Sequence, residues 1–231
     1  MDNTKITQNS QEFGDVIAKE IVRLIQNEIE EKASCYIAVS GGSTPVPVFK
    51  ILGSDPYLNK IDWSRVHVFF IDERCVEPES KENNFQSCYY HWLKNIKEIR
   101  YHRINGWIDP DTAAQEYEND IAKTIPSKGA IPSFDLIFMG IGNDGHIASL
   151  FPEYDFDNKD QGLVRHVVVD SKIQDRITMT IPLLNNAKNR IFGIIGYSKK
   201  KIYSDLLSSK NTNYPVSHLL SSDATDLWVL Q

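Results

Sequence analysis

The amino-acid sequence predicts an α/β protein whose mostly parallel sheet is covered by helices on both faces. Short apolar segments of strand character alternate with segments of helical periodicity along most of the chain. Several of the apolar segments lack the alternation of a half-exposed strand, which is typical of parallel strands buried on both faces. The 231 residues contain no internal repeat, low-complexity tract or long linker. We therefore expect a single domain over residues 1–231.

The expected elements alternate in type along the chain. The first helix carries apolar residues at helical spacing, and Asn9 with Glu12 resembles a capping box at its start. The next helix is expected to begin at Pro45, because proline suits the first turn. The expected helices cover residues 10–30, 45 onward, 83–94, 110–124 and 197–209. The expected strands cover residues 36–39, 66–71, 134–139, 164–169, 176–181, 191–196 and 226–230. The polar stretch 155–162 is expected to form a surface loop.

Composition and charge disfavour several classes of partner. The net charge is -6, and the longest basic cluster is the lysine triplet 199–201, which argues against nucleic acid and anionic membranes as partners. No apolar run approaches the ~20 residues of a membrane span, and the N-terminus lacks the pattern of a signal peptide. The three cysteines match neither a disulfide framework nor a zinc pattern. We expect reduced thiols and a cytoplasmic location.

The most informative segment is the glycine-rich run over residues 139–146, which follows an apolar strand. Three glycines within six residues predict a tight loop, because glycine accepts backbone angles that other residues avoid. The loop places Asp144 and His146 at the carboxyl end of a strand, where open α/β sheets bind ligands. His146 is therefore a candidate acid–base residue, and the alternative is a turn with an incidental histidine.

Two further polar loops follow strands of the same expected sheet. The segment 40–44 offers backbone N–H groups and hydroxyls ahead of a helix, which suits an anion. The segment 72–74 places three charges after a strand, and Arg74 has the forked geometry that binds phosphate oxygens. Asp72 or Glu73 is expected to orient Arg74 or to bind a sugar hydroxyl. Taken alone, either loop is also consistent with an ordinary exposed turn.

The carboxyl ends of parallel strands lie along one edge of a sheet, so these loops predict one shared site. Two more basic residues, Arg176 and Lys199, lie at the borders of later strands and add positive charge for a phosphate. Isolated basic residues are more often solvated surface charges, which is the alternative for both. The candidate substrate-binding residues are Gly41, Gly42, Ser43, Thr44, Asp72, Arg74, Arg176 and Lys199.

Together these segments resemble the family of 6-phosphogluconolactonases and glucosamine-6-phosphate isomerases. The matching blocks run in the same order through most of the chain, and the block from Gly140 to Pro152 is the most specific. The sequence departs from the family pattern at Ser80, where histidine is frequent, and at Glu153, where glycine is common. Asn83 and Asn84 also replace a Ser-Asn pair. The matching blocks are Ser40–Pro45, Asp72–Arg74, Gly140–Pro152, Arg176–Thr180 and Gly196–Lys199.

The resemblance implies a Rossmann-like fold, shared with glucosamine-6-phosphate deaminase and ribose-5-phosphate isomerase. It implies hydrolysis of 6-phospho-D-glucono-1,5-lactone to 6-phospho-D-gluconate in the oxidative pentose phosphate pathway, with no metal or organic cofactor. In the family, the residue matching His146 is the proposed base. The residues matching Arg74, Arg176 and Lys199 are associated with the phosphate of the substrate.

Hydrolysis of a lactone needs a water molecule, a base and donors for the oxyanion. An imidazole such as that of His146 can take a proton from water and return it to the ring oxygen. Asp144 is a candidate for holding the tautomer of that imidazole. No serine or cysteine stands out as a nucleophile, so direct attack by water is expected. Backbone N–H groups of either glycine loop, 41–42 or 140–145, are candidates for binding the oxyanion, and the sequence does not choose between them.

Two other functions remain open at this point. One is a different enzyme of the same fold, an aldose–ketose isomerase or an amino-sugar deaminase. The deaminase pattern has a glutamate five residues after the histidine, where this chain has Phe151, and Asp-Glu-Tyr where it has Asp72-Glu73-Arg74. The other is a sugar-phosphate sensor, which needs a DNA-binding module. Too few residues precede Tyr36 for a helix-turn-helix in addition to the first helix.

Overall fold

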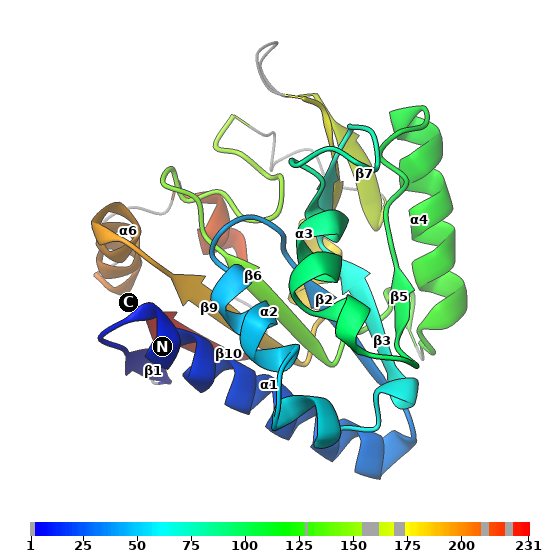
Figure 1. The fold of residues 1–231 in the computed structure, drawn as a ribbon. Coiled ribbons are helices and arrows are strands. Elements are labelled where there is room, and N and C mark those ends of the chain that lie inside the picture. The colour runs from blue at the N-terminus through cyan, green and yellow to red at the C-terminus, as the bar shows by residue number, and fades with distance from the viewer. Residues whose placement is uncertain (1–2, 128, 154–161, 169–173, 209–212, 220–223) are drawn as a thin grey trace.

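The computed structural model describes residues 3–127, 129–153, 162–168, 174–208, 213–219 and 224–231. Except for Gly162, the expected surface loop at 155–162 lies outside the described residues. The central feature is a seven-stranded parallel sheet in the order β1-β10-β9-β6-β2-β3-β5 (Figure 1). Its strands are β1 (Thr4–Ile6), β2 (Cys35–Val39), β3 (Val66–Phe70), β5 (Arg100–His102), β6 (Leu136–Gly140), β9 (Asn189–Ile194) and β10 (Thr225–Leu230).

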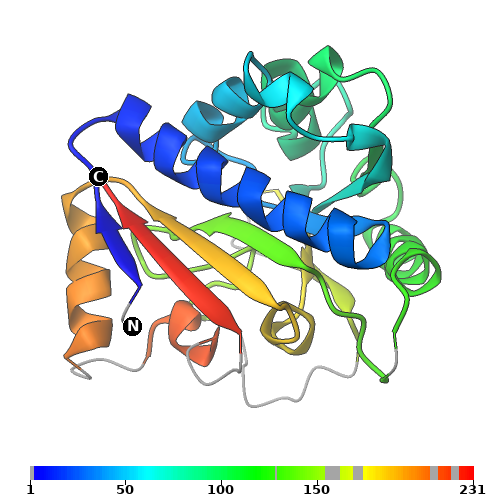
Figure 2. The ribbon, with the colours of Figure 1, turned by 90° about the horizontal axis from the view of Figure 1, so that it is seen from below.

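Helices cover both faces of this sheet, so the predicted fold class is confirmed. Figure 2 shows α1 along one face and α6 on the opposite face. No helix among the described residues is both long and apolar enough to cross a membrane. The α-helices are α1 (Ser10–Lys32), α2 (Val46–Leu52), α3 (Asn84–His91), α4 (Pro110–Thr124), α5 (Ile181–Asn185) and α6 (Tyr197–Leu207). Short 3-10 helices occur at Tyr57–Asn59, Trp63–Arg65, Leu93–Asn95 and Pro215–Leu219.

Helix α1 shows how the sequence pattern produces the packing. The side chain of Asn9 accepts a hydrogen bond from the N–H of Glu12, and the Glu12 carboxylate accepts one from the N–H of Gln8. These bonds satisfy N–H groups that lack a partner within the helix. The apolar side chains at helical spacing, among them Phe13 and Ile17, are fully buried against the sheet. The expected helix at 10–30 is thus confirmed and continues to Lys32.

A second, smaller sheet differs from the expectation for the segment after β3. It is antiparallel, in the order β4-β8-β7, with β4 at Asp72–Arg74, β7 at Val164–Val167 and β8 at Arg176–Met179. The charged triplet 72–74 was expected to be a polar loop, but its backbone pairs with β8 instead. Figure 1 shows β7 of this sheet beside α4.

Other differences concern short elements and element ends. The expected strand 176–181 ends at Met179, because Pro182 lies in the first turn of α5. The expected helix 83–94 ends at His91 and is followed by the 3-10 turn Leu93–Asn95. Strands β1 and β5 were not expected, since each has only three residues and is defined by pairing with a neighbour.

The order of the parallel strands defines a switch point next to β2. From β2 the chain proceeds to β3 and β5 on one side, and it then returns to β6, β9 and β10 on the other side. Ligands of open α/β sheets bind outside the carboxyl ends of the strands at such a reversal. The polar segments that follow β2, β3 and β6, one of which is β4, all lie at this edge.

Candidate active site

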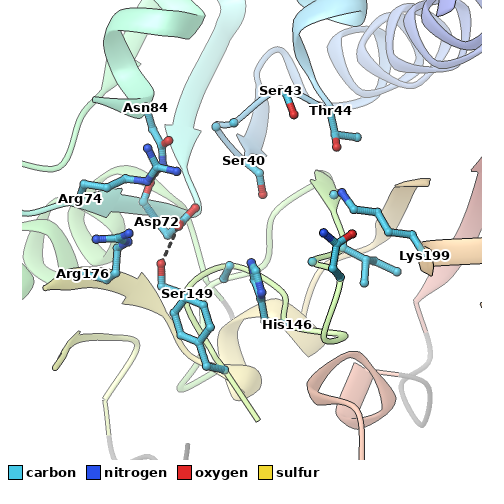
Figure 3. Close-up of a pocket in the computed structure, with 18 residues that line it drawn as sticks. Ser40, Ser43, Thr44, Asp72, Arg74, Asn84, His146, Ser149, Arg176 and Lys199 are labelled. Carbon is cyan, nitrogen blue, oxygen red and sulfur yellow. Dashed lines mark hydrogen bonds between the residues drawn. The ribbon is translucent and has the colours of Figure 1, made fainter. Parts of the chain in front are cut away.

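A cavity of about 360 Å³ opens at the carboxyl ends of β6, β2 and β3 (Figure 3). It brings together the three polar loops that the sequence predicted to converge. Asp144 does not line the cavity but contacts His146, which does. The predicted residues that line it are Gly41, Gly42, Ser43, Thr44, Asp72, Arg74, His146, Arg176 and Lys199.

The loop after β6 is shaped to receive the imidazole of His146. The N–H of Gly142 donates to the carbonyl oxygen of His146 over 2.8 Å, and the N–H of Gly145 donates to that of Gly142 over 3.1 Å. Gly145 has a φ of +83°, which glycine adopts without strain. A Cβ atom on Gly142 would lie 2.1 Å from Nδ1 of His146. Only glycine at position 142 therefore leaves room for the imidazole in this position.

Asp144 fixes the protonation pattern of the imidazole. Its Oδ1 lies 2.6 Å from Nδ1 of His146 and also accepts the backbone N–H of His146 over 3.1 Å. Burial acts to raise the pKa of the Asp144 carboxyl, but the N–H and the imidazole of His146 outweigh burial and lower that pKa. The resulting carboxylate only accepts hydrogen bonds, so Nδ1 carries the proton. Nε2 of His146 then holds the lone pair that a base requires.

The loop after β2 presents donors without partners. The backbone N–H groups of Gly41, Gly42, Ser43 and Thr44 make no hydrogen bond to any described residue, and neither do the hydroxyls of Ser43 and Thr44. Gly42 has a φ of +82°, and Thr44 is buried. Gly42 and Ser43 are exposed at the cavity, so these donors are available to a ligand rich in acceptors.

Lys199 lies on the same side of the cavity as Ser43 and Thr44, near the start of α6 (Figure 3). Its ammonium group forms no ion pair within the described part of the chain. Burial lowers the pKa of Lys199. A half-buried cation without a counter-ion next to unpaired donors is suited to an anionic ligand.

Asp72 lies on the opposite side of the cavity and is held by Ser149 and Asn84, which the sequence analysis did not assign to the site. Ser149 donates its hydroxyl to Oδ2 of Asp72 over 2.7 Å, and the backbone N–H of Ser149 donates to Thr178 over 3.2 Å. The amide of Asn84 donates to the carbonyl oxygen of Asp72 over 2.9 Å. Ser149 lies within the motif that follows His146, which is the one available sequence signal for it. Asp72 and Ser149 are 77 positions apart, so no local pattern predicts their contact.

Glu73 has a structural role in the start of α3. The side chain is fully buried, and its carboxylate accepts the backbone N–H groups of Arg74, Asn84 and Phe85 over 2.7–2.9 Å. Burial raises the pKa of Glu73 to about 7, although these N–H groups favour the charged form. Glu73 does not line the cavity, so it positions Asn84 and Arg74 rather than binding a ligand.

Arg74 and Arg176 face each other across the β4–β8 ladder, and Figure 3 shows both on the Asp72 side of His146. Arg74 donates to the carbonyl oxygen of Glu82, and Arg176 donates to that of Gln174. Neither guanidinium forms an ion pair with a carboxylate among the described residues. The structure thus divides the basic residues, with two arginines on one side of His146 and Lys199 on the other.

The site shows no arrangement of metal ligands. Within the described ranges, no group of three or more histidine, cysteine, aspartate or glutamate side chains is placed to hold a metal ion.

Phe151 packs on the imidazole of His146 with a centroid distance of 4.6 Å. Phe151 stands five residues after His146 in the sequence, where the deaminase pattern has a glutamate.

The chain is similar to known proteins over most of its length. Residues 8–228 match the family model described as glucosamine-6-phosphate isomerases/6-phosphogluconolactonase. The chain is 33% identical to a "probable 6-phosphogluconolactonase" of Dictyostelium discoideum, over 96% of this chain and 95% of that protein. It is 32% identical to the 6-phosphogluconolactonase of a Synechocystis species, over 89% of this chain and 85% of that protein. The crystal structure of 6-phosphogluconolactonase from Thermotoga maritima superposes with a TM-score of 0.83 at 26% identity, covering 99% of this chain and 98% of that one.

Proposed function

The chain belongs to the family of glucosamine-6-phosphate isomerases and 6-phosphogluconolactonases, and we propose that it hydrolyses 6-phospho-D-glucono-1,5-lactone to 6-phospho-D-gluconate. This reaction is the second step of the oxidative pentose phosphate pathway. The observation that carries the proposal is the Asp144–His146 pair, whose Nε2 is free to act as a base beside a cavity with unpaired anion-binding groups on both sides. The matching relatives carry the same activity in their names.

In the proposed mechanism, His146 acts first as a base and then as an acid. Nε2 takes a proton from a water molecule while the water oxygen attacks the lactone carbonyl carbon. The resulting imidazolium is stabilised by the carboxylate of Asp144, 2.6 Å from Nδ1. When the bond between the carbonyl carbon and the ring oxygen breaks, the imidazolium returns the proton to that oxygen. No covalent enzyme intermediate is needed.

We place the phosphate of the substrate on the Lys199 side of the cavity. That side offers one ammonium group together with the hydroxyls and the unpaired backbone N–H groups of Ser43 and Thr44. A phosphate presents several strong acceptor oxygens, which such a set of donors satisfies. Asp72 is the one carboxylate that lines the cavity among the described residues, and it lies on the arginine side. A phosphate carries up to two negative charges and would be repelled by Asp72 more strongly than a singly charged group.

The identity of Phe151 favours lactone hydrolysis over the other chemistry of the family. Deamination of an amino sugar moves a proton between carbons and uses a carboxylate relay to the histidine. Here the aromatic ring of Phe151 contacts the imidazole instead and can neither accept a proton nor polarise His146. Lactone hydrolysis needs no such relay.

Replacement of Lys199 tests the proposed phosphate site. Lys199→Ala is expected to reduce kcat/KM for 6-phosphogluconolactone about 10- to 100-fold, the loss of one or two charge-assisted hydrogen bonds. Activity on unphosphorylated glucono-1,5-lactone, measured at high concentration, should change little. Lys200→Ala removes a neighbouring lysine that does not line the cavity and is the matched control. Equal losses on both lactones would contradict the placement of the phosphate, and the absence of lactonase activity in the wild-type protein would contradict the function.

A further inference from the structure

The arrangement of Arg74 and Arg176 is unfavourable unless a negative charge is added. The two residues are direct cross-strand partners in β4 and β8, where like charges destabilise a sheet. Arg176 is only 8% exposed, and both burial and the charge of Arg74 lower its pKa. Side-chain entropy and desolvation also oppose holding two guanidinium groups in this place. A site with this composition is suited to bind an anion.

The charges on this side of the cavity favour a ligand group that carries a single negative charge. Asp72 is the one carboxylate among the described residues that line the cavity, and it partly offsets the two guanidinium groups. Among the side chains that line the cavity on this side, one positive charge remains in excess, and the charge of Glu82, outside the lining, also acts on Arg176. A phosphate carries between one and two negative charges near neutrality, whereas the tetrahedral intermediate of ester hydrolysis develops one on the former carbonyl oxygen.

The backbone alternatives for binding this oxyanion are restricted by their existing hydrogen bonds. In the loop after β6, the N–H groups of Gly142 and Gly145 already donate to the carbonyl oxygens of His146 and Gly142, while those of Ile141 and Asn143 remain available. Of the unpaired N–H groups in the loop after β2, those of Ser43 and Thr44 lie on the side of Lys199, where the phosphate is placed, whereas Gly41 lies beside Asn84. The arginine side of the cavity carries the two guanidinium groups beside Asp72, and we assign the reacting carbonyl group to this side.

We propose that Arg74 and Arg176 stabilise the oxyanion of the tetrahedral intermediate, which makes them catalytic residues rather than phosphate ligands. The inference rests on the proposed lactonase function. As water attacks, the π electrons of the carbonyl move to its oxygen, which accepts N–H bonds from the guanidinium groups. As the intermediate collapses, these electrons reform the carbonyl and the ring oxygen leaves with the proton held by His146. The product keeps a carboxylate at this place, so the same arginines bind the product.

Kinetics on two lactones separate this role from phosphate binding. Arg74→Ala should lower kcat about 100-fold, the usual effect of removing an oxyanion donor, by the same factor on 6-phosphogluconolactone and on glucono-1,5-lactone. Arg74→Lys keeps the charge but loses the fork, and should recover part of the lost kcat. Competitive inhibition by 6-phosphogluconate should weaken in both variants. Arg23→Ala, which removes an exposed arginine on α1, is the matched control.

The possible outcomes distinguish the two proposals. Loss of activity on the phosphorylated lactone alone would overturn the inference and assign Arg74 to the phosphate, while leaving the lactonase function intact. An unchanged kcat in a folded Arg74→Ala protein would also overturn it. Failure of the wild-type protein to hydrolyse either lactone would overturn both proposals. Arg176→Lys repeats the test at the buried partner, and thermal unfolding of each variant identifies any that fail to fold.

Discussion

Gly142→Ala tests whether the imidazole of His146 must occupy the position seen in the structure. The Cβ atom would lie 2.1 Å from Nδ1 and 2.2 Å from Cε1 of His146, and 2.7 Å from Oδ1 of Asp144. Ordinary van der Waals contacts to a Cβ atom begin at 3.4 Å, so the imidazole must move by more than ~1 Å. A misplacement of about 1 Å costs on the order of 100-fold in rate. We therefore expect kcat to fall about 100-fold.

The fold should tolerate this substitution. The φ of Gly142 lies outside the left-handed region, so alanine fits the backbone. Replacing glycine by alanine lowers the conformational entropy of the unfolded chain, which stabilises the folded protein by about 0.4–1 kcal/mol. This gain opposes the strain at His146. The Tm should change by less than about 4 °C. Gly129→Ala is the control, because a Cβ atom there meets nothing within 4 Å. A Gly142→Ala protein with the kcat of the wild type would refute the role assigned to the position of His146.

Three further predictions concern the proton relay, pH and the rival reaction. Asp144→Asn should lower kcat at least about 10-fold with little change in Tm, because a neutral amide stabilises the imidazolium less than a carboxylate does; an unchanged kcat would remove Asp144 from the mechanism. Burial, followed by the charges of His102 and Arg100, lowers the pKa of His67 from 6.5 to about 4. The unfolded chain then binds more protons in this window, so the free energy of unfolding should decrease as the pH falls from 6.5 toward 4. Denaturant titrations should show a smaller decrease for His67→Gln, and an equal decrease would contradict this assignment. Incubation with glucosamine 6-phosphate should release no ammonia above the blank, and release at a rate comparable to lactone turnover would favour a deaminase.

The convergence of the polar loops could be predicted from the sequence because it follows from sheet geometry. Parallel strands place their carboxyl ends at one edge, so apolar strands followed by glycine or charge identified the loops after β2, β3 and β6. The position of His146 in a glycine-rich loop was equally visible. The side-chain pairing of Asp144 with His146 also fits the expectation, although residues two apart need not face each other.

The remaining features depend on contacts between distant segments. The triplet Asp72–Arg74 has no strand pattern of its own and becomes β4 through pairing with β8. That pairing sets Arg74 opposite Arg176, and the turn of the chain into α6 sets Lys199 on the other side of His146. The sequence could therefore list the basic residues but could not divide them between a phosphate site and a site for the reacting carbonyl. Ser149 was missed for the same reason, since its partner Asp72 lies in β4, 77 positions away.

Hydrolysis of freshly prepared 6-phosphogluconolactone by the wild-type protein and by His146→Ala, corrected for spontaneous hydrolysis, tests the central claim most directly. The wild-type protein should accelerate the reaction, and the variant should lose about 10²- to 10⁴-fold in kcat/KM, as expected for a positioned acid–base group. The variant should remain folded, since His146 lies in a cavity rather than in the core. A folded His146→Ala protein with wild-type turnover, or a wild-type protein without lactonase activity, would contradict the account.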